Sequence, residues 1–156
     1  MTTRLYQYRE CGLENVWLAN GFDIVDAPSG RHVKIKNIDG LHKAIGRMLI
    51  TNRKRLSGKE IRFLRQELLM SQTTLAKLLE VADQTVHRWE TDKAEMPKSA
   101  EALLRLLYRE HIDANSKINI RQKLEKIADL EDKLDGYQIT LRKNKQDAWV
   151  PEKIAA

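Results

Sequence analysis

The distribution of glycine and proline is the feature that most restricts how this 156-residue chain can fold. Six of the seven glycines lie before residue 59, and the seventh is Gly136. Residues 59–135 contain no glycine and a single proline, Pro97. Because both residue types interrupt regular helices, this stretch is predicted to be helical, and the regions on either side of it are predicted to contain turns.

Four short helices are predicted in this part of the chain. Ser57 and Glu60 form a capping-box pattern, in which each side chain binds a backbone amide at the start of a helix. Ser71 is placed to start a second helix, a very short third helix begins near Asp83, and Pro97 suits the first turn of a fourth. The apolar residues that share the inner faces of the first three helices are Ile61, Leu64, Leu68, Leu75, Leu78, Leu79, Val86 and Trp89, and the fourth helix carries Leu103, Leu104, Leu106 and Leu107.

The N-terminal flank is predicted to contain a hairpin followed by a helix. Apolar and polar residues alternate in two short runs, and residues 27–30 between them have the composition of a turn. This pattern predicts a hairpin with strands 22–26 and 31–36. Asp39 then stands where an N-cap would precede a helix with Leu41, Ile45 and Leu49 at helical spacing.

The C-terminal flank is predicted to contain an amphipathic helix and a second hairpin. Apolar residues recur at helical spacing between residues 112 and 134, either for packing on the same domain or for pairing as a coiled coil. Two further apolar segments, 137–141 and 147–150, flank a polar turn and predict a terminal hairpin. The N-terminal hairpin is its expected partner, because a two-stranded sheet is only marginally stable by itself.

Charge is concentrated in one part of the chain. Residues 40–66, the basic stretch, contain eight lysines and arginines and one acid, giving +7 against a formal charge of +6 for the whole chain. This stretch is either a solvated basic face or a surface that binds a polyanion, most commonly a nucleic acid. Arg53, Lys54 and Arg55 directly precede the predicted helices and are interpreted as an arm that contacts a DNA backbone, although a solvated linker has the same composition.

The segment most informative about function is residues 71–90. It predicts two helices of about eight residues, of which the second is too short to be stable without packing. Val86 and Trp89 share one face of this second helix and are assigned to the core. The opposite face presents glutamine, threonine and arginine, which can pair with adenine, thymine and guanine in a major groove.

Ten positions carry a family resemblance: Ser71, Gln72, Leu75, Ala76, Leu78, Leu79, Val81, Val86, Trp89 and Glu90. Their spacing resembles that of Xre-type helix-turn-helix proteins, the phage repressor and Cro-like family, over about residues 57–110. The resemblance implies a sequence-specific protein that binds double-stranded DNA. It also implies that Arg65 pairs with Glu90 and thereby holds the third helix on the first.

The same resemblance implies which residues meet DNA. The expected base contacts are Asp83, Gln84, Thr85 and Arg88. The expected backbone contacts are Ser71, Gln72, His87 and Lys93, in addition to the basic arm, and a solvated side chain is an equal alternative for His87. A helix N-terminus such as that at Gln72 favours a phosphate because its amides are free and its dipole is positive there.

Three positions depart from the family pattern. Glu80 and Asp92 stand where glycine is usual, and Ala82 stands where a serine or threonine usually caps the second helix of the motif. Because alanine cannot cap, Asp83 is expected to take over this role, which would remove its side chain from base contact.

The N-terminal segment also resembles that of MqsA-like and HigA-like antitoxins and bacterial regulators in which such a segment precedes an Xre domain. The residues that carry this resemblance are Tyr8, Cys11, Gly12, Leu13, Asn15, Val16, Trp17, Leu18, Asn20, Gly21 and Phe22. Paired cysteines that bind zinc occur in the MqsA type. Cys11 is the only cysteine here, so a zinc site is not expected.

Composition excludes several other classes of protein. With 42% apolar and 32% charged residues, the chain can bury a core and stay in solution. No run resembles a membrane span or a signal peptide, and the single cysteine allows no internal disulfide, which fits a cytoplasmic protein. The four histidines are scattered, so no metal, cofactor or catalytic site is expected.

The sequence therefore predicts a mainly α fold with small β parts, in which a helix-turn-helix domain of four to five helices is flanked by N-terminal and C-terminal β-hairpins. The expected domains are an accessory region at 1–50, the DNA-binding domain at 51–112, and a candidate dimerisation region at 113–156. The expected function is transcriptional regulation by a homodimeric repressor. The alternatives are an antitoxin that masks a toxin and represses its own operon, and a ligand-sensing N-terminal region.

Overall fold

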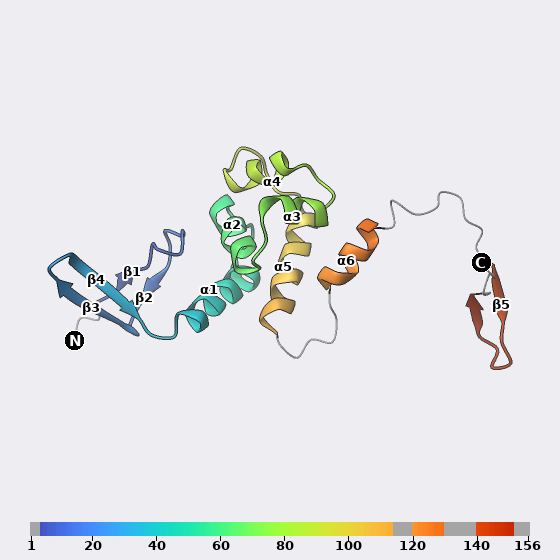
Figure 1. The fold of residues 1–156 in the computed structure, drawn as a ribbon, viewed down its shortest axis with the longest axis horizontal. Coiled ribbons are helices and arrows are strands. Elements are labelled where there is room, and N and C mark those ends of the chain that lie inside the picture. Colours follow the sequence, from blue (N-terminus) through green and yellow to red (C-terminus); the bar gives the residue numbers. More distant parts are fainter. Residues whose placement is uncertain (1–3, 114–119, 130–139, 152–156) are drawn as a thin grey trace.

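The middle of the chain forms four helices in the computed structural model, which describes residues 4–113, 120–129 and 140–151. They are α2 (Gly58–Glu67), α3 (Gln72–Leu78), α4 (Asp83–Glu90) and α5 (Lys98–Ile112). In Figure 1, α4 lies at the top, above α2, α3 and α5. The molecule is mainly helical and carries small antiparallel strand pairs.

Serine side chains start two of these helices. The Ser57 hydroxyl accepts a hydrogen bond from the Glu60 amide at 3.3 Å, and the Glu60 carboxylate accepts one from the Ser57 amide at 2.9 Å. At α3, the Ser71 hydroxyl accepts a bond from the Thr74 amide at 3.0 Å. Each bond satisfies an amide that has no partner within the helix.

The core lies where α2, α3, α4 and α5 meet. Leu64, Leu75, Val86 and Leu104, one from each helix, have no exposed surface. Among the four leucines of α5, Leu106 is half exposed. The reason is that α5 is 15 residues long and turns its buried face through residues 101, 104, 107 and 108, so Leu106 points to the opposite side.

Residues 4–52 form the N-terminal module, in which four short strands precede a helix. The strands are β1 (Tyr6–Gln7), β2 (Trp17–Leu18), β3 (Phe22–Ala27) and β4 (Gly30–Ile35), and α1 (Ile38–Asn52) follows them. β1 pairs with β2 and β3 with β4, both antiparallel, so the β3–β4 ribbon covers nearly the residues predicted for the first hairpin. Tyr8, Leu13 and Leu18 pack into the same core as the helical domain.

The start of α1 differs from the prediction. The N-cap is Asn37, not Asp39, which lies inside the first turn. Asn37 has a left-handed backbone with φ 49°, and its side-chain oxygen accepts a hydrogen bond from the Gly40 amide at 3.2 Å. Asparagine tolerates this conformation better than most residues. The left-handed backbone places the side-chain oxygen of Asn37 over the start of the helix, where it can accept a bond from a free amide.

The C-terminal part consists of α6 (Ile120–Asp129) and a hairpin of β5 (Leu141–Lys143) and β6 (Trp149–Pro151). α6 packs on α3 and α5, and Ile120 and Leu124 contact the core. Among the described residues this favours packing on the same domain over a coiled coil. Residues 130–139, where part of the helix and the first strand were predicted, lie outside the described residues.

The predicted pairing of the two hairpins is wrong. Within the described residues each sheet has two strands, and β5–β6 is not joined to β3–β4. At the base of the N-terminal ribbon, Phe22 packs against Tyr6, with their ring centroids 5.3 Å apart. The β1–β2 pair therefore covers the ribbon base that a third strand would have covered.

None of the described helices is both long enough and apolar enough to cross a membrane.

Candidate nucleic-acid interface

The turn between α3 and α4 holds the two helices in the arrangement expected of a helix-turn-helix. α3 ends at Leu78, and Glu80 adopts a left-handed backbone with φ 56°. The Val81 amide then bonds to the Ala76 carbonyl at 2.9 Å, which closes the turn. Glu80 thus adopts a backbone conformation that glycine adopts more easily, at a cost in conformational free energy on the order of 1 kcal/mol.

α4 buries one face and exposes the other. Val86 and Trp89 are buried against the neighbouring helices, as their shared face predicted. The exposed side chains on α4 are Asp83, Gln84, His87 and Arg88. Thr85 is only partly exposed, because it lies at the edge of the packed face beside Val86. An exposed helix that carries amide, imidazole and guanidinium groups has the donors and acceptors that read base edges.

A buried ion pair fixes α4 on α2. Arg65 donates from Nε to Glu90 Oε2 at 2.6 Å and from Nη2 to Glu90 Oε1 at 3.0 Å. A third bond runs from Arg65 Nη1 to the Met70 carbonyl at 2.8 Å. The two side chains are only 10% and 2% exposed, so this bidentate pair lies in the core. Its geometry sets the angle at which α4 leaves the domain.

Gln72 and Ser71 have protein partners at the start of α3. Gln72 Nε2 donates to Glu90 Oε1 at 3.1 Å, which ties the predicted phosphate-binding residue to the buried ion pair. The Ser71 hydroxyl is 2.9 Å from that of Thr74, in addition to its bond with the Thr74 amide. Both residues lie beside α4, and their contact with DNA stays a prediction.

Asp83 does not cap α4, contrary to the expectation. The N-cap is Ala82 and makes no side-chain bond. Asp83 is instead the first helical residue, and its Oδ2 accepts a hydrogen bond from the Thr73 hydroxyl at 3.0 Å. A side chain inside the first turn lies beyond the amides that an N-cap serves. Asp83 therefore stays on the exposed face of α4.

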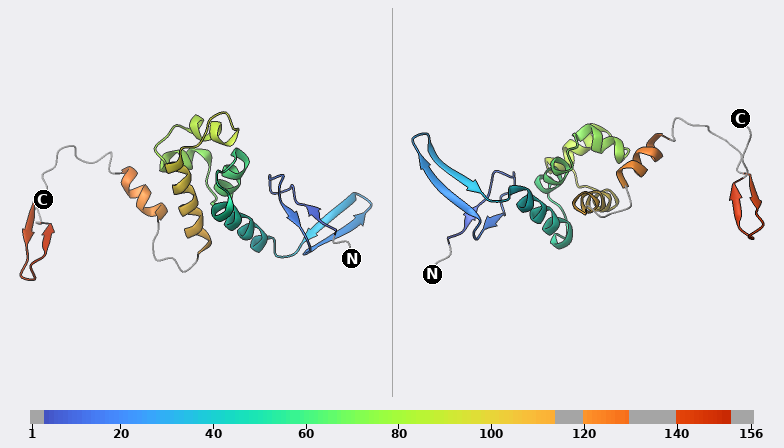
Figure 2. Two further views of the ribbon diagram at one scale, coloured as in Figure 1. Left: turned by 180° about the vertical axis from the view of Figure 1, so that it is seen from behind. Right: turned by 60° about the horizontal axis from the view of Figure 1, so that its bottom comes forward.

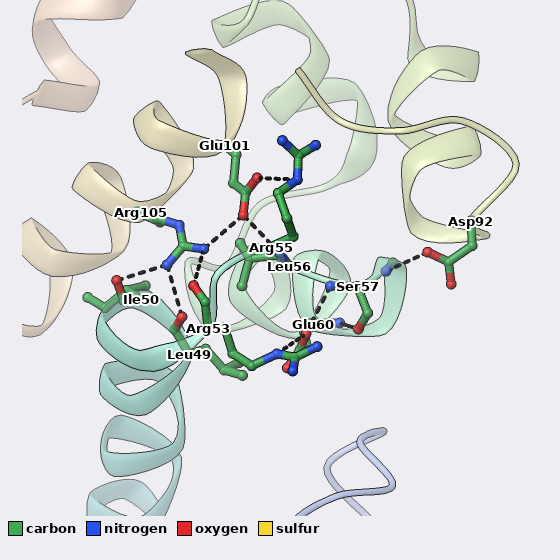
Figure 3. Close-up of polar contacts among 11 residues, drawn as sticks. Leu49, Ile50, Arg53, Arg55, Leu56, Ser57, Glu60, Asp92, Glu101 and Arg105 are labelled. Atoms are coloured by element: carbon green, nitrogen blue, oxygen red, sulfur yellow. Dashed lines mark hydrogen bonds and ion pairs between the residues drawn. The ribbon is translucent and has the colours of Figure 1, made fainter. Parts of the chain in front are cut away.

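The basic arm is largely held by the protein itself, as Figure 3 shows. Arg53 Nε donates to Glu60 Oε1 at 3.2 Å, where Glu60 is buried. Arg55 donates to the Met96 carbonyl at 2.8 Å and pairs with Glu95 at 2.9 Å. Of the three arm residues, only Lys54 is exposed and forms no ion pair with another described residue. The two arginines are therefore held by contacts within the protein, and their contact with a DNA backbone stays a prediction.

Two residues that sequence reasoning missed connect the N-terminal module to the helical domain. Arg105 donates to the carbonyls of Leu49 and Ile50 at 3.1 and 2.9 Å, and so caps the C-terminus of α1 (Figure 3). Glu101 is buried and accepts bonds from Arg105 and from the Leu56 amide, both at 2.8 Å. Their i, i+4 spacing on α5 is also that of an ordinary surface ion pair, so the sequence carried no signal of burial.

The loop after α4 is fixed to the start of α2. Asp92 has a left-handed backbone with φ 58°, and its Oδ1 accepts a bond from the Gly58 amide at 2.9 Å. A Cβ at position 58 would collide with the Glu90 carbonyl, so only glycine allows this close approach. Lys93, predicted to contact DNA, lies exposed in the same loop.

A hydrogen-bonded chain of three side chains joins the N-terminal module to α2. The Tyr8 hydroxyl lies 2.7 Å from His42 Nε2, and His42 Nδ1 lies 2.5 Å from Glu67 Oε1. Burial raises the pKa of Tyr8. Burial likewise raises the pKa of the Cys11 thiol, which donates to the Tyr8 carbonyl at 3.4 Å. A neutral, partly buried thiol is a packing group and a weak nucleophile.

Among the described residues, no group of three or more histidine, cysteine, aspartate or glutamate side chains is arranged to hold a metal ion.

Comparison with known proteins identifies the same part of the chain as the site geometry does. Residues 61–107 match the family model HTH_3, described as helix-turn-helix. The match includes all of α3 and α4 and supports a DNA-binding regulator in general. No curated protein and no solved structure matches the chain. The N-terminal module lies outside the matched residues, so its resemblance to MqsA-like and HigA-like antitoxins stays a prediction.

Proposed function

We propose that the protein is a sequence-specific repressor that binds a pseudo-palindromic operator in double-stranded DNA as a homodimer. The observation that carries this proposal is the exposed face of α4, where Gln84, His87 and Arg88 project from a helix held by the Arg65–Glu90 pair. A short helix anchored in this way can enter a major groove and present these side chains to base edges.

Each exposed side chain of α4 has a preferred base partner. The Gln84 amide can pair with adenine and the Arg88 guanidinium with guanine, while Asp83 can accept a bond from the amino group of cytosine. The hydrogen bond from Thr73 engages only one oxygen of the Asp83 carboxylate. We therefore expect operators rich in these bases at the positions that α4 faces.

The homodimer follows from the size of the reading surface. One α4 helix reads a single half-site, and dimers of such proteins read two half-sites about 34–36 Å apart. Binding close to its own promoter would make the protein a repressor by excluding the polymerase.

Selection of bound sequences from a random DNA pool, followed by footprinting upstream of the protein's own gene, tests this proposal. We expect enrichment of a two-fold symmetric sequence and protection of a matching upstream site. The selection is repeated with an Arg88→Ala chain. Lys34→Ala, which makes the same charge change on the exposed edge of β4, is the control variant. A pool that shows no enrichment at moderate salt would contradict the proposal.

An antitoxin function is the second candidate. The β3–β4 ribbon exposes Ile24 and Val25, and Figure 1 shows it on the side of the molecule away from α4. A toxin could therefore occupy the ribbon while α4 is bound to DNA. Co-purification of a small protein encoded beside the gene, lost in an Ile24→Lys chain, would support this function, and its absence would leave a regulator alone.

A further inference from the structure

A hollow of about 340 Å³ lies where the N-terminal module meets the start of α2. This volume is in the range of sites for small molecules. In Figure 1 and in both views of Figure 2, the loop between β1 and β2 lies next to α1 and α2. The lining comes from this loop, the basic arm, α2 with its N-cap, and the loop after α4: Leu13, Glu14, Asn15, Arg53, Ser57, Lys59, Glu60 and Asp92.

One carboxylate oxygen in this lining has no donor. The Glu60 side chain is only 3% exposed, and its Oε1 accepts bonds from the Ser57 amide at 2.9 Å and from Arg53 Nε at 3.2 Å. Its Oε2 is buried and bonds to no described residue. Figure 3 shows this carboxylate between Arg53 and Ser57. Because a buried carboxylate oxygen without a donor is costly, we expect a donor from outside the described residues at Oε2.

The backbone amides that open α2 are not available to an anion. The Ser57 amide bonds to the Glu60 carboxylate, and the Glu60 amide bonds to the Ser57 hydroxyl at 3.3 Å. The Gly58 amide bonds to Asp92 Oδ1 at 2.9 Å. A helix N-terminus binds phosphate or carboxylate through free amides, and these three amides have acceptors already.

The side-chain charges of the lining favour a cation. Three acids, Glu14, Glu60 and Asp92, stand against two cations, Arg53 and Lys59, so the net charge is −1. Arg53 is paired with Glu60 and Lys59 with Glu14. Asp92 is exposed and uses Oδ1 in its bond to the Gly58 amide, which leaves Oδ2 for a ligand. Since no three acidic side chains among the described residues are arranged around a metal ion, an organic cation fits this lining better than a metal.

We propose that this hollow binds a short aliphatic diamine in its doubly protonated form, with one ammonium group donating to Glu60 Oε2 and the other to Asp92 Oδ2. Ammonium groups supply N–H donors with a positive charge, and hydrogen bonds between charged groups are the strong ones. Leu13, the apolar residue of the lining, meets the methylene groups of the ligand. The diamine joins α2 to the loop after α4, so it is an effector of the DNA-binding domain that binds away from the exposed face of α4.

Isothermal titration calorimetry of the full chain with putrescine, a four-carbon diamine, tests the site. We expect a single putrescine bound per chain. The control ligand is its hexamethyl derivative, which has the same charge and chain length but no N–H donor. We expect this derivative to bind about tenfold more weakly or worse, because the charged hydrogen bonds are lost. Equal binding of the two ligands, or no binding of putrescine at millimolar concentration, would overturn the proposal.

Two nearly isosteric substitutions remove the proposed acceptors. Glu60→Gln keeps the capping pattern with Ser57, since glutamine also serves in a capping box. Asp92→Asn keeps an acceptor for the Gly58 amide, and asparagine suits the left-handed backbone there. Each substitution is expected to lower the affinity for putrescine about tenfold or more. Glu95→Gln, in the same loop but outside the lining, is the matched control and is expected to leave the affinity unchanged.

Denaturant unfolding of each variant separates loss of the site from loss of the fold. Asp92→Asn changes an exposed side chain, so it keeps the test decisive if Glu60→Gln does not fold. Wild-type affinity in either folded variant, or an equal loss in Glu95→Gln, would overturn the proposal. These measurements contain no DNA, so their outcome does not depend on whether the protein binds an operator.

Discussion

The basic stretch, residues 40–66, and the recognition segment, residues 71–98, belong to one helical assembly and use charge in opposite ways. The basic stretch carries +7, whereas the recognition segment contains four basic and five acidic residues. The two sets meet in the structure, where Arg65 pairs with Glu90 and Arg55 with Glu95. Two of the eight cations of the basic stretch are therefore engaged by the recognition segment, and one of them, Arg65, fixes the position of α4.

The difference shows how little net charge says about where a polyanion binds. Half of the eight basic side chains in the stretch have carboxylate partners within the protein; they are Arg53, Arg55, Lys59 and Arg65. A paired cation contributes less to phosphate binding, because its charge is already compensated. The recognition segment contributes few cations, but all four are exposed, and one of them, Arg88, lies on the exposed face of α4 with Gln84.

The largest expected effect comes from breaking the contact between the two regions. Arg65→Met leaves Glu90 charged and buried without its main partner, and we expect a loss of about 3–5 kcal/mol in the free energy of unfolding. Denaturant unfolding measures this change. The double variant Arg65→Met/Glu90→Leu should recover much of the loss, because no buried charge remains.

Arg62→Met is the matched control for that experiment, since Arg62 lies on the exposed face of the same helix. We expect a change within about 0.5 kcal/mol, as is usual for surface substitutions. Equal losses in the two variants would show that Arg65 has no special role.

The second effect concerns the recognition segment alone. Arg88→Ala and Gln84→Ala should each weaken operator binding by about 1–3 kcal/mol while leaving binding to random DNA nearly unchanged. Fluorescence anisotropy on the two DNA types measures the ratio. Equal losses on both would contradict the assignment of base contacts to α4.

The third effect separates the two kinds of cation within the basic stretch. Lys54→Met should lower the slope of log binding constant against log salt by about 0.9, with stability unchanged, because Lys54 is free to meet a phosphate. Arg53→Met should leave that slope unchanged and cost about 1–2 kcal/mol of stability, because the buried Glu60 carboxylate keeps its bond from the Ser57 amide but loses its ion-pair partner. The reverse pattern, in which Arg53→Met lowers the slope and Lys54→Met lowers the stability, would indicate that Arg53 contacts a DNA phosphate, as the sequence predicted.

The smallest effect is electrostatic and lies at the surface. Lys59 Nζ donates to Glu14 at 2.7 Å, and this bond lowers the pKa of the Glu14 carboxyl. A lowered pKa in the folded state means that the pair stabilises the protein above the pKa of the unfolded carboxyl. This contribution is lost as the pH falls through the folded pKa.

Lys59→Met should therefore raise the pKa of Glu14 in an NMR titration and lower the urea midpoint at pH 7 but not at pH 2. A Glu14 pKa that does not change in the variant would show that the pair does not persist in solution.

Features of the fold that rest on local chemistry could be predicted from the sequence. The caps at Ser57 and Ser71, the helical middle and the inward positions of Val86 and Trp89 all follow from residue type and spacing. The predicted caps Asp39 and Asp83 were wrong, because each depends on where a helix begins to within one or two residues.

The sequence by itself determined that the chain has a helix-turn-helix and which face of its second helix is polar, because both depend on contacts between residues close in the chain. Only the tertiary structure decided which charges remain available. Glu60, Glu90 and Glu101 are buried and take their arginine partners from distant segments or from the adjacent turn. Whether a cation holds the fold or reaches a ligand depends on its neighbours in space, which linear charge patterning does not specify.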